Sequence, residues 1–337
     1  MTKLPFDLQN RTMASVYPKG GRPALDAVPR SFSFVLNVAR LRNLSSNAAL
    51  LAPGHKLRKA TEVEIEAIRD VLTTIAAASD FGPWQRGKPI VTGKKTTYAK
   101  IPARQWRYFV IAFTGSNDTS SQIERTLSIT PLELKIGFTL LREAFPNAPM
   151  LIFSPARLFA QVQRAMHGKM PFLDVTAGDV RNIRLLNDQL QRYDFEPSNL
   201  KRLMEQMLDS DALPYDSPLR FLGYFAILES MLTHQPKKTD TIDSITRQVK
   251  QKVVLLNNRW QTPIDYSPFE DKKPETIWSA MYSYRSTLAH GGKPDFKDEL
   301  RLLKDHDRAL ELLTRTVKSI LRQAVIEPQL LFDLRNC

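Results

Sequence analysis

Apolar side chains recur at helical spacing through the C-terminal third of the chain, and this pattern limits that part to a helical fold. In the first stripe, Phe221, Phe225, Leu228 and Leu232 are three or four residues apart, the spacing of one helix face. Three more stripes follow, and a long loop, Gln261–Lys273, separates the second from the third. The second stripe consists of Ile242, Ile245, Val249, Val253 and Leu256, the third of Trp278, Met281, Tyr282, Leu288 and Ala289, and the fourth of Leu303, Leu310, Leu313, Val317 and Leu321. Four such helices predict an all-α four-helix bundle over residues 218–327, ended by Pro328, with a tail over 328–337.

The preceding part of the chain has a mixed pattern and predicts an α+β domain over residues 1–208. The first 30 residues are rich in Pro, Gly and polar side chains and predict no core of their own. Capping signals at Thr61 with Glu64, at Thr130–Pro131–Glu133 and at Thr176 with Asp179 predict three helices, the second of them reaching about Ala144. Strands are expected at Trp106–Phe113 and Met150–Phe153, and the polar, proline-containing segment Asp209–Pro218 is expected to be a linker.

Composition limits the classes of function. The 337 residues carry a net charge of +13, and residues 1–200 contain 27 Lys and Arg against 16 Asp and Glu, whereas 201–337 contain 21 against 19. Such asymmetry favours a polyanion as partner of the N-terminal part. The only cysteine is Cys337, and the histidines have no cysteine neighbours at metal-ligand spacing, so we expect no metal and no cofactor. Without an apolar leader or a membrane-length apolar run, we expect a soluble, cytoplasmic protein.

An arginine is expected at the centre of the third helical stripe. Counting about 100° per residue from Trp278 places Arg285 on the same face as Met281 and Leu288. A guanidinium keeps its charge, and burying it unpaired costs several kcal/mol. Arg285 therefore requires a carboxylate in the chain, a partner chain, or an anion in a cleft. Glu229, at the edge of the first stripe, is the candidate carboxylate, and a buried Arg285–Glu229 pair that only holds the bundle together is the structural alternative.

His290 comes at the end of the same helix, before Gly291 and Gly292, where a left-handed helix cap is expected. The negative end of the helix dipole favours its protonated form. An obligate cation and a titratable ring can act together on a phosphodiester. In an ideal helix Arg285 and His290 point about 140° apart, so both reach one phosphate only if the last turn unwinds or if each comes from a different subunit. A histidine that merely caps the helix is the alternative.

Arg285, four residues and then His290 match the R-x-x-x-x-H motif of the HEPN superfamily. The segment Phe221–Leu232, with Glu229, looks like the first helix of the ApeA-like branch of that family. The resemblance covers residues 218–325 and implies a HEPN-like bundle of the kind found in prokaryotic toxins, CRISPR effectors and abortive-infection proteins. Lys293 stands where toxins paired with a nucleotidyltransferase antitoxin have tyrosine, so that pairing does not fit.

The resemblance implies a metal-independent endoribonuclease, a toxin or effector of anti-phage defence, that acts on RNA as a homodimer through the C-terminal bundle. Arg285 would neutralise the scissile phosphate and His290 would transfer a proton while the ribose 2′-hydroxyl attacks. Glu229 would orient either group, and Ser286 is the small polar residue that often follows the arginine. The alternatives are a non-catalytic HEPN module that binds RNA or assembles a defence complex, and a nucleotide-binding sensor. His306, between Asp305 and Asp307, is expected at the surface.

A second candidate site lies in residues 81–117, which contain no acidic residue. Cations that follow a phosphate backbone and rings that stack on bases are what single-stranded nucleic acid requires. A basic surface hairpin whose rings face the core is the alternative. The predicted nucleic-acid-binding residues, through which the N-terminal domain would meet RNA or a phage-derived trigger, are Trp84, Arg86, Lys88, Lys94, Lys95, Arg104, Trp106, Arg107 and Tyr108, with Tyr98 as a further ring.

Overall fold

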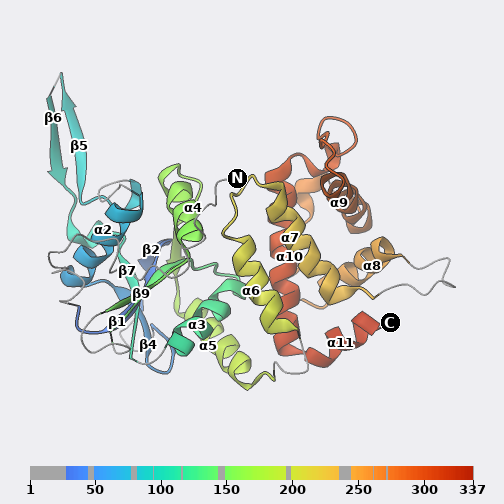
Figure 1. Ribbon diagram of the computed structural model, residues 1–337, viewed down its shortest axis with the longest axis horizontal. Coiled ribbons are helices and arrows are strands. Elements are labelled where there is room, and N and C mark those ends of the chain that lie inside the picture. The colour runs from blue at the N-terminus through green and yellow to red at the C-terminus, as the bar shows by residue number, and fades with distance from the viewer. Residues whose placement is uncertain are drawn as a thin grey trace, which may run out of the picture. The chain divides into compact units, whose positions relative to one another are not determined.

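A computed structural model of the chain (Figure 1) describes residues 28–44, 49–76, 82–93, 95–114, 117–142, 149–194, 199–234, 244–260, 262–270 and 272–336. It divides into two compact units, one made of Met1–Leu127 and Pro131–Asp188, the other of Ser128–Thr130 and Gln189–Cys337. The first unit is sheet-rich and the second is mostly helical, which confirms the predicted order of an α+β part before a helical part. The unit boundary lies nearer the N-terminus than the expected linker. Most of the first 30 residues, for which no core was predicted, lie outside the described residues.

The first unit is built on a six-stranded antiparallel sheet in the order β3-β4-β7-β1-β8-β9. The central strand, β1 (Ser31–Val35), pairs with β7 (Phe109–Phe113) and β8 (Ile136–Leu141), and all three are mostly buried. The remaining strands are β3 (Leu50–Ala52), β4 (His55–Lys59) and β9 (Met150–Ile152). The strands expected near Trp106–Phe113 and Met150–Phe153 are confirmed as β7 and β9.

Helices cover both faces of this sheet. The core on one face gathers Phe32 and Phe34 with apolar residues of α2 (Glu62–Ala76) and α4 (Pro155–Met166). The core on the other face joins Val35 and Ile111 to residues of α3 (Asn117–Ile129) and α5 (Ala177–Arg192). The helices predicted from the Thr61–Glu64 and Thr176–Asp179 boxes are confirmed, because in each box the acidic side chain accepts from the threonine N–H at 2.7 and 2.8 Å.

The helix predicted from Thr130–Pro131–Glu133 is wrong, because the chain there runs as strand β8. Asn37 fixes the entry to the strand: its side chain donates to the Glu133 carbonyl and accepts from the Lys135 N–H, at 2.8 and 2.9 Å. Ile136–Leu141 is buried throughout, as expected of a strand covered on both faces. Burial in the sheet therefore overrides the local capping signal.

Two small sheets complete the first unit. Strands β2 (Val38–Leu41) and β10 (Leu173–Val175) pair in parallel. Strands β5 (Gly87–Thr92) and β6 (Lys95–Lys100) form an antiparallel hairpin that projects from the body of its unit (Figure 1).

The second unit is organised around α7 (Pro218–Leu232), which is buried on most sides, as expected of a helix that is apolar all round. It packs against α6 (Leu200–Ser210), α8 (Ile245–Asn257), α9 (Pro274–Ala289), α10 (His306–Ile326) and α11 (Pro328–Asn336). The four predicted helices are therefore present, although the last, expected to begin at about Lys297, begins at His306, and Ile242 of the second stripe lies outside the described residues. The predicted tail is wrong over 328–336, because these residues form α11, whose Leu331 is buried. Within the described part of the chain, every helix is too short or too polar to cross a bilayer.

Candidate functional site

The core face of α9 is made of Ile277, Trp278, Met281 and Tyr284. Arg285 is half-buried beside this face, and Ala289 is exposed. The expectation that Arg285 is central in the buried stripe is therefore wrong. The helix is turned so that Trp278 and Tyr284 are both fully buried, whereas its third ring, Tyr282, is half-buried. Burying Trp278 and Tyr284 removes more apolar area from water than burying Leu288 and Ala289 would.

Arg285 is paired with Glu229 of α7. Its Nη2 donates to Glu229 Oε2 at 3.1 Å, and the two side chains are 31% and 17% exposed. The guanidinium carbon also lies 5.9 Å from the centre of the Tyr282 ring. The other carboxylate oxygen, Oε1, is buried and accepts no hydrogen bond from any residue that the structure describes. Glu229 thus holds one edge of the guanidinium and leaves part of Arg285 open to solvent.

His290 is the C-cap of α9 and is exposed. The Gly292 N–H donates to the Thr287 carbonyl at 2.8 Å and the Gly291 N–H to the Leu288 carbonyl at 3.1 Å, with Gly291 at a φ of 70°. These bonds form a Schellman motif and confirm the left-handed cap predicted at the two glycines. Neither the His290 ring nor the half-buried Ser286 side chain bonds to another described residue. The ring is free to meet a ligand.

The structure does not bring Arg285 and His290 together within one chain. Helix α9 is regular through Ala289, and His290 has near-helical dihedral angles, φ −93° and ψ 9°. The last turn therefore does not unwind before the glycines, and the two side chains leave the helix about 140° apart. Of the two ways to place both groups on one phosphate that the sequence offered, unwinding of the last turn is not observed.

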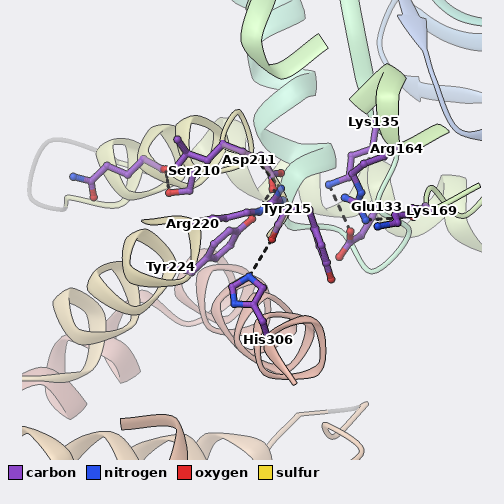
Figure 2. A network of polar contacts seen from close by, with 12 residues as sticks. Glu133, Lys135, Arg164, Lys169, Ser210, Asp211, Tyr215, Arg220, Tyr224 and His306 are labelled. Carbon is purple, nitrogen blue, oxygen red and sulfur yellow. Dashed lines mark hydrogen bonds and ion pairs between the residues drawn. The ribbon is translucent and has the colours of Figure 1, made fainter. Parts of the chain in front are cut away.

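A series of hydrogen bonds next to this site was not predicted from the sequence. The Tyr284 hydroxyl donates to His306 Nδ1 at 2.6 Å, and His306 Nε2 donates to the Tyr215 carbonyl at 3.1 Å, an assignment that fits the neutral Nε2–H tautomer. Figure 2 shows His306 pointing toward Tyr215. Burial raises the pKa of Tyr284 to about 12. The expectation of a solvated His306 is wrong: the ring is half-buried at the first residue of α10, capped by Asp305.

The expected linker Asp209–Pro218 is also packed, around a buried ion pair (Figure 2). Asp211 Oδ1 accepts from Arg220 Nη2 and from the Tyr224 hydroxyl, the latter at 2.8 Å. Arg220 and Asp211 are 6% and 7% exposed, and Arg220 Nη1 also donates to the Leu213 carbonyl at 3.3 Å. The linker prediction is therefore wrong, because a charge pair nine residues apart ties the segment to α7.

The basic stretch in the first unit does not form the predicted stacking surface. Trp84 and Tyr108 are core residues, and the Tyr108 hydroxyl donates to the Trp84 carbonyl at 2.6 Å. Trp106 is half-buried against the core and donates through Nε1 to the Ile101 carbonyl. The predicted stacking role of Trp84, Trp106 and Tyr108 is wrong, because each ring is used in packing. The sequence signal for this is the buried strand that follows, since Tyr108 directly precedes its first residue, Phe109, and Trp106 lies three residues before it.

The cations of the stretch fall into two groups. Arg86 pairs with Glu66 at 2.5 Å and lies over the Trp106 ring, while Arg107 lies 4.7 Å from the centre of the Phe172 ring. The structure exposes Lys88, Lys100 and Arg104 together with Tyr98. Lys95 begins β6, and Lys94 lies outside the described residues.

No protein-family model, no curated protein and no solved structure matches this chain. In the part of the chain that the structure describes, no three His, Cys, Asp or Glu side chains are grouped closely enough to hold a metal ion.

Proposed function

We propose that the helical unit is a metal-independent endoribonuclease of the HEPN type, in which α7, α8, α9 and α10 form the four-helix bundle. The observation that carries the proposal is the end of α9. There a partly open guanidinium, Arg285, is held by Glu229, and an exposed ring, His290, is fixed by a helix cap and has no partner among the described residues. A fixed cation and a free titratable ring are the groups that phosphodiester chemistry requires.

In this reaction RNA supplies its own nucleophile. The O2′–P bond forms as the 2′-hydroxyl loses its proton, and the P–O5′ bond breaks as the leaving oxygen gains one, giving a 2′,3′-cyclic phosphate and a 5′-hydroxyl. His290 transfers one of these protons. Arg285 stabilises the charge that develops on the phosphate oxygens, Glu229 positions Arg285, and Ser286 is next to the phosphate-binding edge.

The catalytic unit in this proposal is a homodimer. Because one α9 helix directs Arg285 and His290 about 140° apart, one subunit supplies the arginine and the other supplies the histidine at each phosphate. The partly exposed Arg285 and the exposed His290 are both available to a second chain. A defence setting, in which cleavage of host RNA stops a phage infection, follows from the resemblance and belongs to the proposal.

Incubation of the purified protein with total RNA in EDTA tests this function. The wild type should cleave RNA and leave cyclic phosphate ends, and His290→Ala should cleave at least about 10²-fold more slowly, the usual share of a general acid or base. His167 is a matched control, because it is also an exposed C-cap histidine, followed by Gly168 at a φ of 68°. His167→Ala should cleave like the wild type. A wild-type protein that cleaves no RNA species in the total RNA would overturn the proposal.

The second candidate is a non-catalytic HEPN module that binds RNA or assembles a complex. The in-chain pair of Arg285 with Glu229 favours it, because a guanidinium with a carboxylate partner has a structural reason to be half-buried. Arg285→Lys separates the two. Lysine keeps the charge but loses the planar fork, so a role in turnover predicts slower cleavage with unchanged stability, whereas a structural role predicts lower stability of the helical unit.

A further inference from the structure

The β5–β6 hairpin exposes both of its faces. Cross-strand partners share a face, so Val91 lies with Tyr98 and Lys100 on one side, whereas Lys88 and Ile90 lie on the other. Ile90, Val91 and Tyr98 are 49%, 70% and 72% exposed, and Lys88 and Lys100 are exposed as well. Each face thus presents a cation beside an apolar side chain.

An exposed two-stranded ribbon is only marginally stable in water, and large exposed apolar side chains point to a binding surface. Thr97 Oγ1, at 3.4 Å from the Ile90 carbonyl, is a weak cross-strand bond. The ribbon therefore gains stability when a partner covers it.

The charge of the ribbon defines that partner. Residues 81–117 contain no aspartate or glutamate, and a further cation of this stretch, Arg104, is exposed too. An acid-free arm with a lysine on each face complements a polyanion whose charges lie on both sides of it.

We infer that the hairpin is a DNA-binding arm that lies in the major groove of duplex DNA. Paired strands are about 5 Å apart, so a ribbon with its side chains fits a groove about 12 Å wide. Lys88 and Lys100 lie at neighbouring positions at the base of the ribbon and on its opposite faces, so their side chains can reach phosphates on opposite walls of the groove. The exposed Ile90 and Val91 can contact thymine methyl groups.

Other nucleic acids fit the arm less well. Single strands are held by several stacked rings, whereas among the described rings of the stretch only Tyr98 is exposed, because Trp84 and Tyr108 are buried and Trp106 is half-buried. Duplex RNA has a major groove too narrow for side chains to read. This inference does not rest on the proposed nuclease activity, because the experiment that tests it measures only the affinity for nucleic acid.

Fluorescence anisotropy with a labelled DNA duplex two helical turns long tests the arm in the full-length protein. The double variant Lys88→Glu with Lys100→Glu should weaken binding at least tenfold. It should also reduce the slope of log affinity against log salt concentration by about 1.8, since each lost phosphate contact removes about 0.9 from that slope. The control is Lys201→Glu with Lys272→Glu, which makes the same charge change at exposed lysines of the helical unit and should leave affinity unchanged.

The same titration with single-stranded RNA, single-stranded DNA, duplex RNA and vesicles of phosphatidylcholine with phosphatidylserine distinguishes the partners. Preference for duplex DNA that the hairpin variant abolishes supports the inference. Equal binding of DNA by both double variants would overturn it, and so would a wild type that prefers a single strand, duplex RNA or vesicles. Val91→Ser leaves every charge in place and should reduce affinity for thymine-containing duplexes more than for duplexes without thymine.

Discussion

Asp211→Ala should strongly destabilise the helical unit. Arg220 and Asp211 are each more than nine-tenths buried, so removing the carboxylate leaves a guanidinium charge without its ion-pair partner in the interior of the unit. Breaking a buried pair in this way costs about 3–5 kcal/mol, and the Tyr224 hydroxyl also loses its acceptor. Because single domains are stable by only about 5–15 kcal/mol, the free energy of unfolding should fall by about a fifth or more.

A second substitution separates charge burial from lost packing. Arg220→Met removes the uncompensated charge and keeps most of the side-chain volume, so Asp211→Ala with Arg220→Met should be more stable than Asp211→Ala alone. Calorimetry is the suitable assay, because two units can unfold separately and a single two-state fit would not apply. A loss below about 1 kcal/mol for Asp211→Ala, the level of an exposed pair, would refute the reasoning, as would a double variant no more stable than the single one.

Three further substitutions test the local structure. Although burial raises the pKa of Glu64, hydrogen bonds from Arg58 and Thr61 lower it below its ordinary value. The ionised carboxylate therefore stabilises the fold above the unfolded-state pKa, and this stabilisation is lost as the pH falls through the folded-state pKa. The stability difference between wild type and Glu64→Gln, measured by urea titration, should shrink between about pH 6 and pH 3, and a constant difference would contradict this. Tyr284→Phe removes the bond to His306 and should cost about 1 kcal/mol in urea denaturation, whereas no loss would mean that the bond is not formed in solution. Gly291→Ala places a side chain at positive φ and should lower the stability of α9, measured by hydrogen exchange, by about 1 kcal/mol; unchanged protection would exclude the left-handed cap.

Local signals predicted the features that local bonds determine. Thr61 with Glu64 and Thr176 with Asp179 supply their own partners within one turn, and the glycines after His290 supply the left-handed residue of a Schellman motif. The same kind of signal failed at Thr130–Pro131–Glu133, because the following segment is buried between β1 and β9 and its entry is fixed by Asn37, a residue distant in sequence.

The candidate site was predicted only in part, because some of its contacts follow from local sequence patterns and others depend on packing between distant elements. The pairing of Arg285 with Glu229 follows from two charges near apolar stripes, and the structure forms it. The rotation of α9 depends on how Trp278 and Tyr284 pack against neighbouring elements, which the spacing of its own residues does not record. The contacts of His306 and Asp211 require elements that the sequence pattern did not place together.

Subunit complementation tests the composite nuclease site most directly. Arg285→Ala and His290→Ala should each be inactive alone, because each symmetric dimer then lacks one group at both sites. Equal amounts of the two variants, mixed and allowed to exchange subunits, should recover about a quarter of wild-type RNA cleavage in EDTA, since half of the dimers are mixed and each has one complete site. Two inactive variants that stay inactive after verified exchange would contradict the composite site, and cleavage by either variant alone at the wild-type rate would exclude Arg285 and His290 as its catalytic groups.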